Sequence, residues 1–182
     1  MTGARQVAFL RAINVGKRRM AMDELLAAIE PVGLDDAWTH IASGNVVFRS
    51  RRAAATIERE LEAALVDAFG YEVEAFVRPA TRVAELAAAE PFGPRRPGTT
   101  HLVVFARGPL EADQRAAVHA LSGPVDHLVA DGAEIHWQIE GKTMDSALTP
   151  RDWRAAGLGP ITNRNVTMLA KLAQRIEQRG GS

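Results

Sequence analysis

Two short polar stretches contain the residue types that bind anions. The first, INVGKRRM, follows an apolar run and joins Asn14 and Gly16 to three consecutive cations that begin at Lys17. The second is SGN at residues 43–45, and it also interrupts apolar sequence. Amide, hydroxyl and cationic side chains beside a helix N-terminus can bind a phosphate or a carboxylate. These stretches predict a small anion site if the fold brings them together.

The elements around these stretches follow a ferredoxin-like order. Residues 5–13 (RQVAFLRAI) are apolar on both alternating faces, which predicts a central strand. A helix with apolar residues at helical spacing then runs towards Gly33, and AWTHIA and NVVFRS form a hairpin around the SGN turn. A second helix at 53–69 and the strand EVEAFVRP complete a split βαβ arrangement. We therefore predict an α+β fold whose N-terminal half is ferredoxin-like, βαββαβ.

This topology predicts where the two polar stretches lie. The first two strands of such a sheet run parallel, with the third strand between them and antiparallel to both. Asn14, Gly16, Ser43 and Asn45 should therefore be neighbours at one end of the sheet, beside the positive end of the first helix. The competing interpretation is structural, because Asn, Gly and Ser are common turn residues and three cations suit a solvated loop. The sequence leaves both interpretations open.

The second half repeats a similar order of elements without sequence similarity to the first. A helix at 81–90 and the stretch PFGPRRPG form the expected connector. A strand (THLVVFA), a helix at 111–121 and a hairpin turning at Asp131-Gly132 follow. The tail is expected to depart from the first half, with a short helix, the extended segment GPITNRN and a final helix over 166–179. We predict a subdomain at 1–79, a connector at 80–98 and a second, related α+β subdomain at 99–182.

The segment TNRN immediately precedes the final helix. Asn163 or Asn165 is a natural N-cap there, and Arg164 and Lys171 would then project near the start of the helix. One interpretation is capping plus surface charge. The other is that this segment folds back to the Asn14 end of the first sheet and completes one polar cleft between the halves, where ligands commonly bind.

Three stretches, LRAINVG, IASGNVVF and TNRNVTMLAKL, together resemble the bacterial family known as domain of unknown function 1697. This chain departs from the family pattern at Ala12 and Lys17, where glycine is usual, and at Ala42, where glutamine is usual; its tail reads NVTM in place of NWNT. The resemblance implies a ferredoxin-like N-terminal half and a second α+β half, and it brings no established activity, substrate or cofactor. Carried over residue by residue, the pattern marks Arg11, Asn14, Gly16, Ser43, Gly44, Asn45, Arg164, Asn165 and Lys171.

Other chemical motifs fail on spacing. EGKT at 140–143 has His136 where a phosphate-binding loop needs a glycine, and no G-x-G-x-x-G is present. The five histidines lack metal-binding spacing, so we predict no metal site. Ser43 lies in a hairpin rather than in a G-x-S-x-G elbow, and the chain has no cysteine. The sequence therefore supports no catalytic nucleophile.

Charge and hydropathy limit the possible functions. Lys and Arg (22) balance Asp and Glu (22), which disfavours an extended nucleic-acid surface but allows a local cationic site. No apolar run approaches the roughly 18 residues that span a bilayer, and the N-terminus does not read as a signal peptide. We expect a cytoplasmic protein that has no membrane partner and binds a phosphate, a nucleotide or a nucleic-acid end. The alternatives are an enzyme acting on a phosphorylated or carboxylated metabolite, with no obvious general base, and a protein–protein interaction module. The cofactor and the oligomeric state stay unknown.

Overall fold

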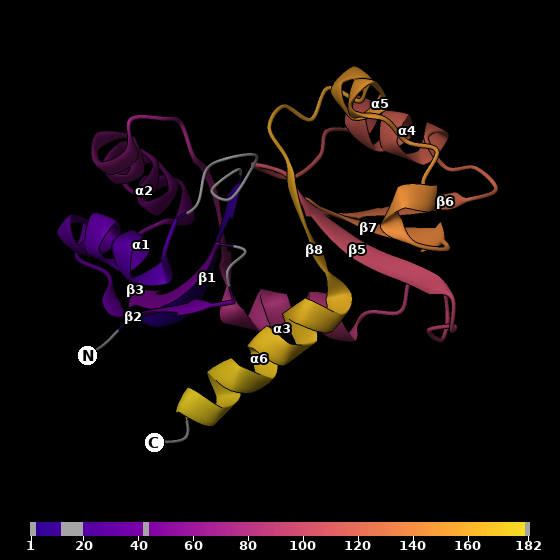
Figure 1. The fold of residues 1–182 in the computed structure, drawn as a ribbon. Coiled ribbons are helices and arrows are strands. Elements are labelled where there is room, and N and C mark those ends of the chain that lie inside the picture. Colours follow the sequence, from indigo (N-terminus) through magenta and orange to yellow (C-terminus); the bar gives the residue numbers. More distant parts are fainter. Residues whose placement is uncertain (1–2, 12–19, 42–43, 181–182) are drawn as a thin grey trace. The chain divides into compact units, whose positions relative to one another are not determined.

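The chain divides into two compact units, Met1–Val83 with Ile176–Ser182, and Ala84–Arg175. The computed structural model describes residues 3–11, 20–41 and 44–180. Each unit has a four-stranded antiparallel sheet with helices on it (Figure 1). This arrangement confirms the predicted α+β fold with two related halves.

The first sheet has the strand order β2-β3-β1-β4 of a ferredoxin-like fold. Its strands are β1 (Ala4–Arg11), β2 (Asp35–His40), β3 (Asn45–Ser50) and β4 (Glu74–Pro79). In the register, Phe9 of β1 lies opposite Asn45 of β3, and Arg11 lies opposite Glu74 of β4. The end of β1 and the start of β3 therefore share one end of the sheet, as the sequence predicts. Successive β1 side chains from Val7 to Leu10 are all buried, which confirms a central strand with two apolar faces.

Helices α1 (Met22–Ile29) and α2 (Ala54–Phe69) lie on one face of the first sheet (Figure 1). A short 3-10 helix, η1 (Glu30–Val32), extends α1. Glycines in the left-handed conformation end η1 and α2, Gly33 at φ 66° and Gly70 at φ 73°. Apolar residues at helical spacing on α1 and α2 meet alternate residues of the strands. The resulting core includes Ala8, Leu10, Leu25, Ile29, Val46, Phe48, Ile57, Leu61 and Leu65.

The second sheet has the equivalent order, β6-β7-β5-β8. Its strands are β5 (Thr99–Phe105), β6 (Asp126–Asp131), β7 (Glu134–Glu140) and β8 (Thr162–Asn165). The expectation that the tail departs from the first half is wrong. The TNRN segment is strand β8, which pairs with β5 as β4 pairs with β1. The segment GPITNRN is extended as predicted, but four residues of alternating burial are too few for the sequence pattern to reveal that it pairs in the sheet.

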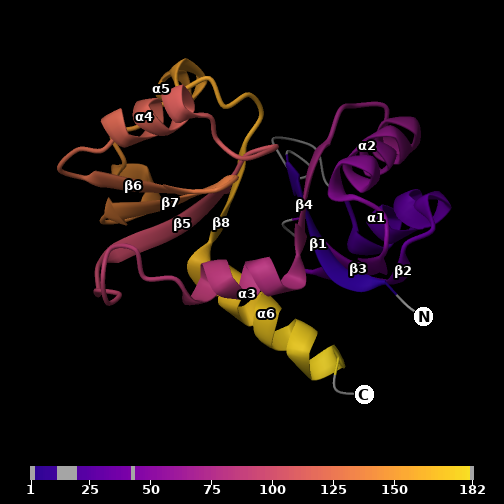
Figure 2. The same ribbon diagram turned by 180° about the vertical axis from the view of Figure 1, so that it is seen from behind.

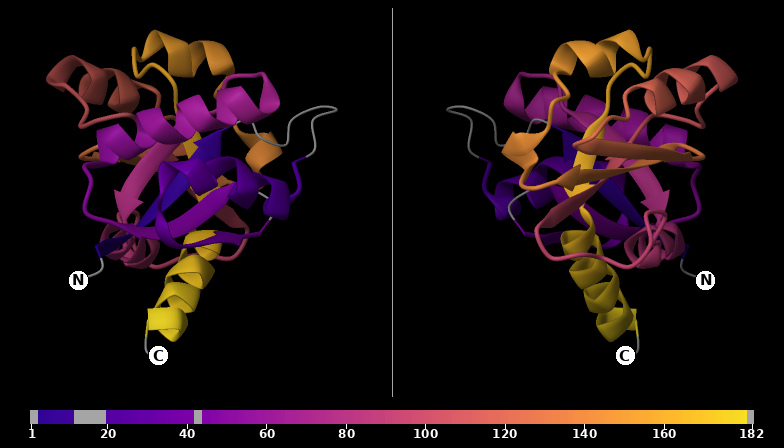
Figure 3. Two further views of the ribbon diagram at one scale, coloured as in Figure 1. Left: turned by 90° about the vertical axis from the view of Figure 1, so that its left-hand side faces the viewer. Right: turned by 90° about the vertical axis from the view of Figure 1, so that its right-hand side faces the viewer.

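Helices α4 (Ala112–Ala120) and α5 (Pro150–Ala155) lie over the second sheet (Figures 2 and 3). They cover a core that includes Leu102, Val104, Leu128, Ile135, Trp137 and Ile139. A second 3-10 helix, η2 (Thr143–Asp145), precedes α5. After the last strand of each sheet the chain continues into a helix, α3 (Ala80–Ala88) or α6 (Val166–Gly180). Apart from the 3-10 helices, the order of strands and α-helices is therefore the same in the two halves.

Candidate functional site

The start of β3 is held by hydrogen bonds of the hairpin that precedes it. The fully buried Asn45 donates from Nδ2 to the carbonyl oxygen of His40 at 3.0 Å. The backbone N–H of Leu10 donates to the Gly44 carbonyl at 2.8 Å, and Gly44 has a φ of 72°, which favours glycine. In the described residues, Gly44 and Asn45 thus make the contacts expected of turn residues. They lie near the end of β1, as predicted.

Arg11 lies at the same end of the first sheet and forms an ion pair. Its Nη1 is 2.6 Å from Glu74 Oε2 on the neighbouring strand, and both side chains are partly exposed. An anion would have to compete with this carboxylate for the guanidinium group. The predicted ligands Asn14, Gly16, Lys17 and Ser43 lie outside the described residues.

The predicted tail residues Arg164 and Asn165 point to opposite faces of β8. Their strand partners are the consecutive residues Val103 and Leu102, and neighbouring strand residues alternate between faces. Arg164 Nη1 donates to Thr162 Oγ1 at 2.9 Å and to the Asn163 carbonyl at 2.7 Å. Burial lowers the pKa of Arg164 to about 10, so it stays charged at neutral pH.

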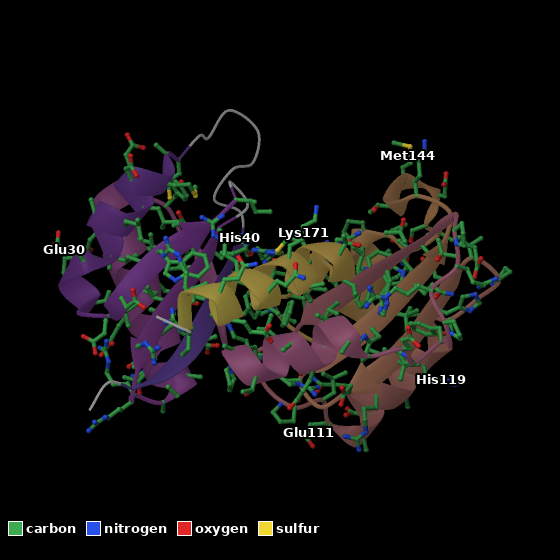
Figure 4. The ribbon with its side chains drawn as sticks, turned by 90° about the horizontal axis from the view of Figure 1, so that it is seen from below. Glu30, His40, Glu111, His119, Met144 and Lys171 are labelled. Carbon is green, nitrogen blue, oxygen red and sulfur yellow. The ribbon has the colours of Figure 1, made fainter. Side chains whose placement is uncertain are left out.

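Asn165 caps α6, as the sequence predicts. Its Oδ1 accepts the backbone N–H of Thr167 at 2.8 Å, which satisfies one of the unpaired donors in the first helical turn. Lys171 lies further along α6 with its side chain exposed (Figure 4). A single site containing these tail residues and the polar residues near β1 stays a prediction.

A cavity of about 250 Å³ lies in the second unit at the start of β5, and Asn165 is one of the residues that line it. It combines cationic, hydroxyl, amide and imidazole side chains with the first two residues of α6. The positive end of the helix dipole therefore contributes to the potential in the cavity. The lining residues are Arg95, Arg96, Thr99, Thr100, His101, Gln138, Asn165, Val166 and Thr167.

Hydrogen bonds hold both arginines of this cavity. Arg95 donates to the Ala87 carbonyl, and Arg96 Nη2 is 2.5 Å from Glu140 Oε1 on β7. Glu140 also lies 3.5 Å from His127 Nε2 and accepts from Gln138. The hydroxyls of two lining threonines are already donated to carbonyls: Thr99 bonds the Arg96 carbonyl at 2.8 Å, and Thr100 bonds that of Gly141 at 2.7 Å. The arrangement presents positive charge, and none of the described residues that line the cavity is Asp or Glu.

A larger cavity of about 700 Å³ lies between α1, η1 and α2, and its lining is mostly apolar. Alanines of the two helices form much of its wall. Its arginine, Arg52, pairs with Glu60 and donates to the carbonyls of Val32 at 2.8 Å and Gly33 at 3.4 Å. These bonds join α2 to the end of η1. We therefore assign the larger cavity to packing and regard the smaller one as the candidate site.

The most informative residues of the cavity, Arg95, Arg96 and His101, are not among the site residues predicted from the sequence. The two arginines belong to the Pro/Gly-rich stretch that was predicted only as a connector. A signal was present, because two adjacent cations lie just before a strand that begins Thr-Thr-His. Extending the split βαβ order into the tail would have placed TNRN beside that strand.

Other kinds of site are not found in the part of the chain that the structure describes. Among residues 3–11, 20–41 and 44–180, no group of three or more His, Asp or Glu side chains is arranged to hold a metal ion. None of the helices in those ranges combines the length and apolar composition needed to cross a bilayer.

Comparisons with known proteins identify a family and a fold. The model of the family described as "Protein of unknown function (DUF1697)" matches residues 4–136, which is more than half of the chain. The solved structure of the conserved bacterial protein SP0830 from Streptococcus pneumoniae is similar, with a TM-score of 0.74 and 23% sequence identity. The alignment covers 97% of this chain and 99% of that one, and it indicates a shared fold. No curated protein matches the chain.

Proposed function

The chain belongs to the DUF1697 family of proteins of unknown function, and we propose from its own cavity that it binds a small phosphate- or carboxylate-bearing anion. The observation that carries this proposal is the joint lining of one cavity by two arginines, Asn165 and the first residues of α6. Charge-assisted hydrogen bonds from guanidinium groups are the strongest that a protein offers to oxyanions. A helix N-terminus adds a favourable potential for the same charge.

The size of the cavity favours a small ligand. Sites for drug-sized molecules usually have volumes of about 300–1,000 Å³, whereas this cavity has about 250 Å³. A phosphate group, a small phosphorylated metabolite or the terminal phosphate of a longer molecule fits this volume better than a whole nucleotide. The balanced charge of the chain also favours local rather than extended contact with phosphates.

Arg95 is the residue on which binding should depend most. Arg96 has a carboxylate partner in Glu140, while the hydrogen bond of Arg95 goes to the neutral carbonyl of Ala87. Losing a hydrogen bond to a charged group costs about 1.5–3 kcal/mol, which corresponds to roughly 10- to 100-fold in affinity. In the part of the chain that the structure describes, the carboxylate beside this lining is that of Glu140, and it is paired with Arg96 rather than with Arg95.

The test is calorimetric titration of the whole chain with sulfate and with inorganic phosphate at low ionic strength. Arg95→Gln should lower the affinity about 10- to 100-fold. The matched control is Arg59→Gln, which removes the same charge from an exposed position on α2 of the other unit. Equal losses in both variants, or an unchanged affinity in Arg95→Gln, would refute the cavity as the binding site.

Arg11→Gln tests whether the predicted residues of the first sheet take part. Arg11 with Asn14, Gly16, Lys17, Ser43, Gly44 and Asn45 forms the other predicted group of ligands. If that group completes the site together with Arg164, Asn165 and Lys171, the Arg11 variant should weaken binding as well. If the cavity of the second unit is sufficient, the affinity of this variant should equal that of the wild type.

A second candidate function, an enzyme acting on a phosphorylated metabolite, is favoured by one observation. His101 lines the cavity, and burial keeps its imidazole neutral at pH 7, so a nitrogen lone pair can accept a proton. The test is release of inorganic phosphate from a panel of small phosphomonoesters. Turnover that His101→Gln abolishes would favour this function over binding alone.

A further inference from the structure

His101 is in contact with a second histidine inside the second unit. Its Nε2 lies 3.0 Å from Nδ1 of His136, and the ring of Phe92 covers it edge-on at a centroid distance of 5.6 Å. Burial, then the neighbouring His136 and then Arg95 lower the pKa of His101 from its ordinary value to about 4. In the empty cavity His101 is therefore neutral at physiological pH.

The position of His136 allows His101 to accept a second proton. A neutral pair shares a single hydrogen between the two facing nitrogens. When His101 carries hydrogens on both ring nitrogens, its Nε2–H donates to Nδ1 of His136. His136 must then carry its own hydrogen on Nε2, which lies 3.9 Å from Asp131 Oδ2. The chain of His101, His136 and Asp131 can thus orient and stabilise a protonated His101.

Charges from three segments decide whether that proton binds. Arg95 of the connector opposes a positive His101, and Arg96 lines the same cavity. His136 of β7 opposes it when His136 is itself protonated, while Glu140 of the same strand is paired with Arg96 and lies 3.5 Å from His127 of β6. Asp131 of β6 favours the proton through His136. An anion beside Arg95 would offset the positive charge of Arg95, which lowers the pKa of His101 after burial and His136.

We propose that anion binding in this cavity is coupled to protonation of His101, which then serves as a third positive ligand. The proposal rests on the function proposed above and adds a specificity: the site prefers dianions and binds them more tightly in acid. Arg95, Arg96 and protonated His101 surround the ligand, and the His136–Asp131 pair holds the imidazole ring in place.

The sign of the pH dependence follows from linkage. An anion that raises the pKa of His101 binds a proton together with the protein, so its affinity increases as the pH falls towards the raised value and below it. One coupled proton limits the increase to about tenfold per pH unit. The increase ends near the pKa of the empty site, about 4.

Sulfate is the appropriate probe because its charge is constant across this range, whereas phosphate itself titrates near neutral pH. Calorimetric titrations of the whole chain with sulfate between about pH 5 and pH 8 should show the affinity rising as the pH falls. Titrations in two buffers of different ionisation enthalpy should show uptake of up to about one proton per bound sulfate.

His101→Gln separates this proposal from a general effect of protein charge. Glutamine keeps hydrogen-bonding groups at the position but cannot titrate, so the affinity of this variant should lose its pH dependence. The control is His119→Gln, which removes an exposed histidine of α4 (Figure 4) and should leave the wild-type profile unchanged. In the wild type, the His101 ring proton signals in an NMR titration should report the raised pKa directly when sulfate is present, even if the His101 variant folds poorly.

The possible outcomes distinguish the two proposals. Sulfate binding with a pH-independent affinity, or a pH profile that persists in His101→Gln, would overturn proton coupling and leave the anion site in place. The absence of sulfate binding at every pH would overturn both. A rise in affinity in acid that His119→Gln removes as well would assign the effect to net charge and would also overturn the coupling.

Discussion

In the first sheet, Val7 of β1 lies directly opposite Val47 of β3, and both side chains are fully buried. In the second sheet, the equivalent strands pair Val103 with His136. Two residues nearer the start of β5, and therefore on the same face, His101 pairs with Gln138. The strand order is the same in both sheets, and so is the apolar face that packs on helices. The fold therefore requires apolar residues on the face of each sheet that packs on helices. The other face can carry polar groups without a change in topology.

The strongest test of this comparison is to create equivalent cavities on the two helix-covered faces. Phe48→Ala in the first core should cost about 3–5 kcal/mol of unfolding free energy, and Ile135→Ala in the second about 2–5 kcal/mol, because both side chains are fully buried. Urea unfolding measures these losses, and Val66→Ala on the exposed side of α2 is the control, with a change within about 0.5 kcal/mol. A large loss in only one sheet would contradict the equal structural role of the two faces.

The two asparagines at strand ends should respond differently to the same change. Asn165→Asp keeps an N-cap of equal quality but puts a negative charge into the cavity, so sulfate affinity should fall about tenfold or more. Asn45→Asp removes the donor to His40 and buries a charge, which should cost about 1–3 kcal/mol of stability and leave sulfate affinity unchanged. Calorimetry and thermal unfolding of both variants measure the contrast. A loss of affinity in Asn45→Asp equal to that in Asn165→Asp would remove the distinction between the two ends.

Glu140 offers a change that should improve binding. It holds Arg96 in an ion pair at 2.5 Å and is partly exposed. Glu140→Gln removes a competing carboxylate, and since such pairs are worth about 0.2–1 kcal/mol, sulfate should bind roughly two- to fivefold more tightly. The same titration series measures the gain, and added salt should reduce it. Weaker binding in this variant would mean that Glu140 positions Arg96 for the ligand more than it competes with the ligand.

The two hairpins differ in backbone strain, and this difference should have the smallest effect. Ile41, beside the first turn, has a φ of 51°, which a β-branched residue rarely adopts, whereas the second turn has Gly132 at φ 67°. Ile41→Asn should stabilise the chain by about 0.5 kcal/mol. Gly132→Ala should destabilise it, although no atom would clash with the added methyl group. Thermal unfolding measures the direction of both changes in stability. A destabilised Ile41→Asn variant would show that the Ile41 side chain makes a contact that stabilises the chain more than the backbone strain destabilises it.

The sequence was sufficient to predict the first sheet because its signals are local and consistent. Two glycines end helices in the left-handed conformation, and apolar residues on both faces identify β1 as central. The strand β8 could not be recognised in the same way, because it has four residues and two of them face solvent. Its partner β5 lies far away in the chain, so only the repeated topology could have revealed it.

The candidate site was predicted only in part. The cap formed by Asn165 follows from its place before α6, and the structure confirms it. Asn165 lines one cavity with Arg95 and His101 only because β8 pairs with β5. This is a tertiary contact, which local sequence patterns do not predict. The contact between His101 and His136 likewise arises across strands, at a sequence distance at which no spacing rule for histidines applies.

The central claim is that the cavity at the start of β5, within the second unit, binds the anion. The most direct measurement is a sulfate titration of the isotopically labelled chain, followed by backbone amide chemical shifts. We expect saturable shifts concentrated at Thr99, Thr100 and Thr167, with Arg59 of α2 and the core strands of the first sheet unaffected. Shifts concentrated at Gly44 and Asn45 with none at Thr167, or no saturable shift at all, would contradict it.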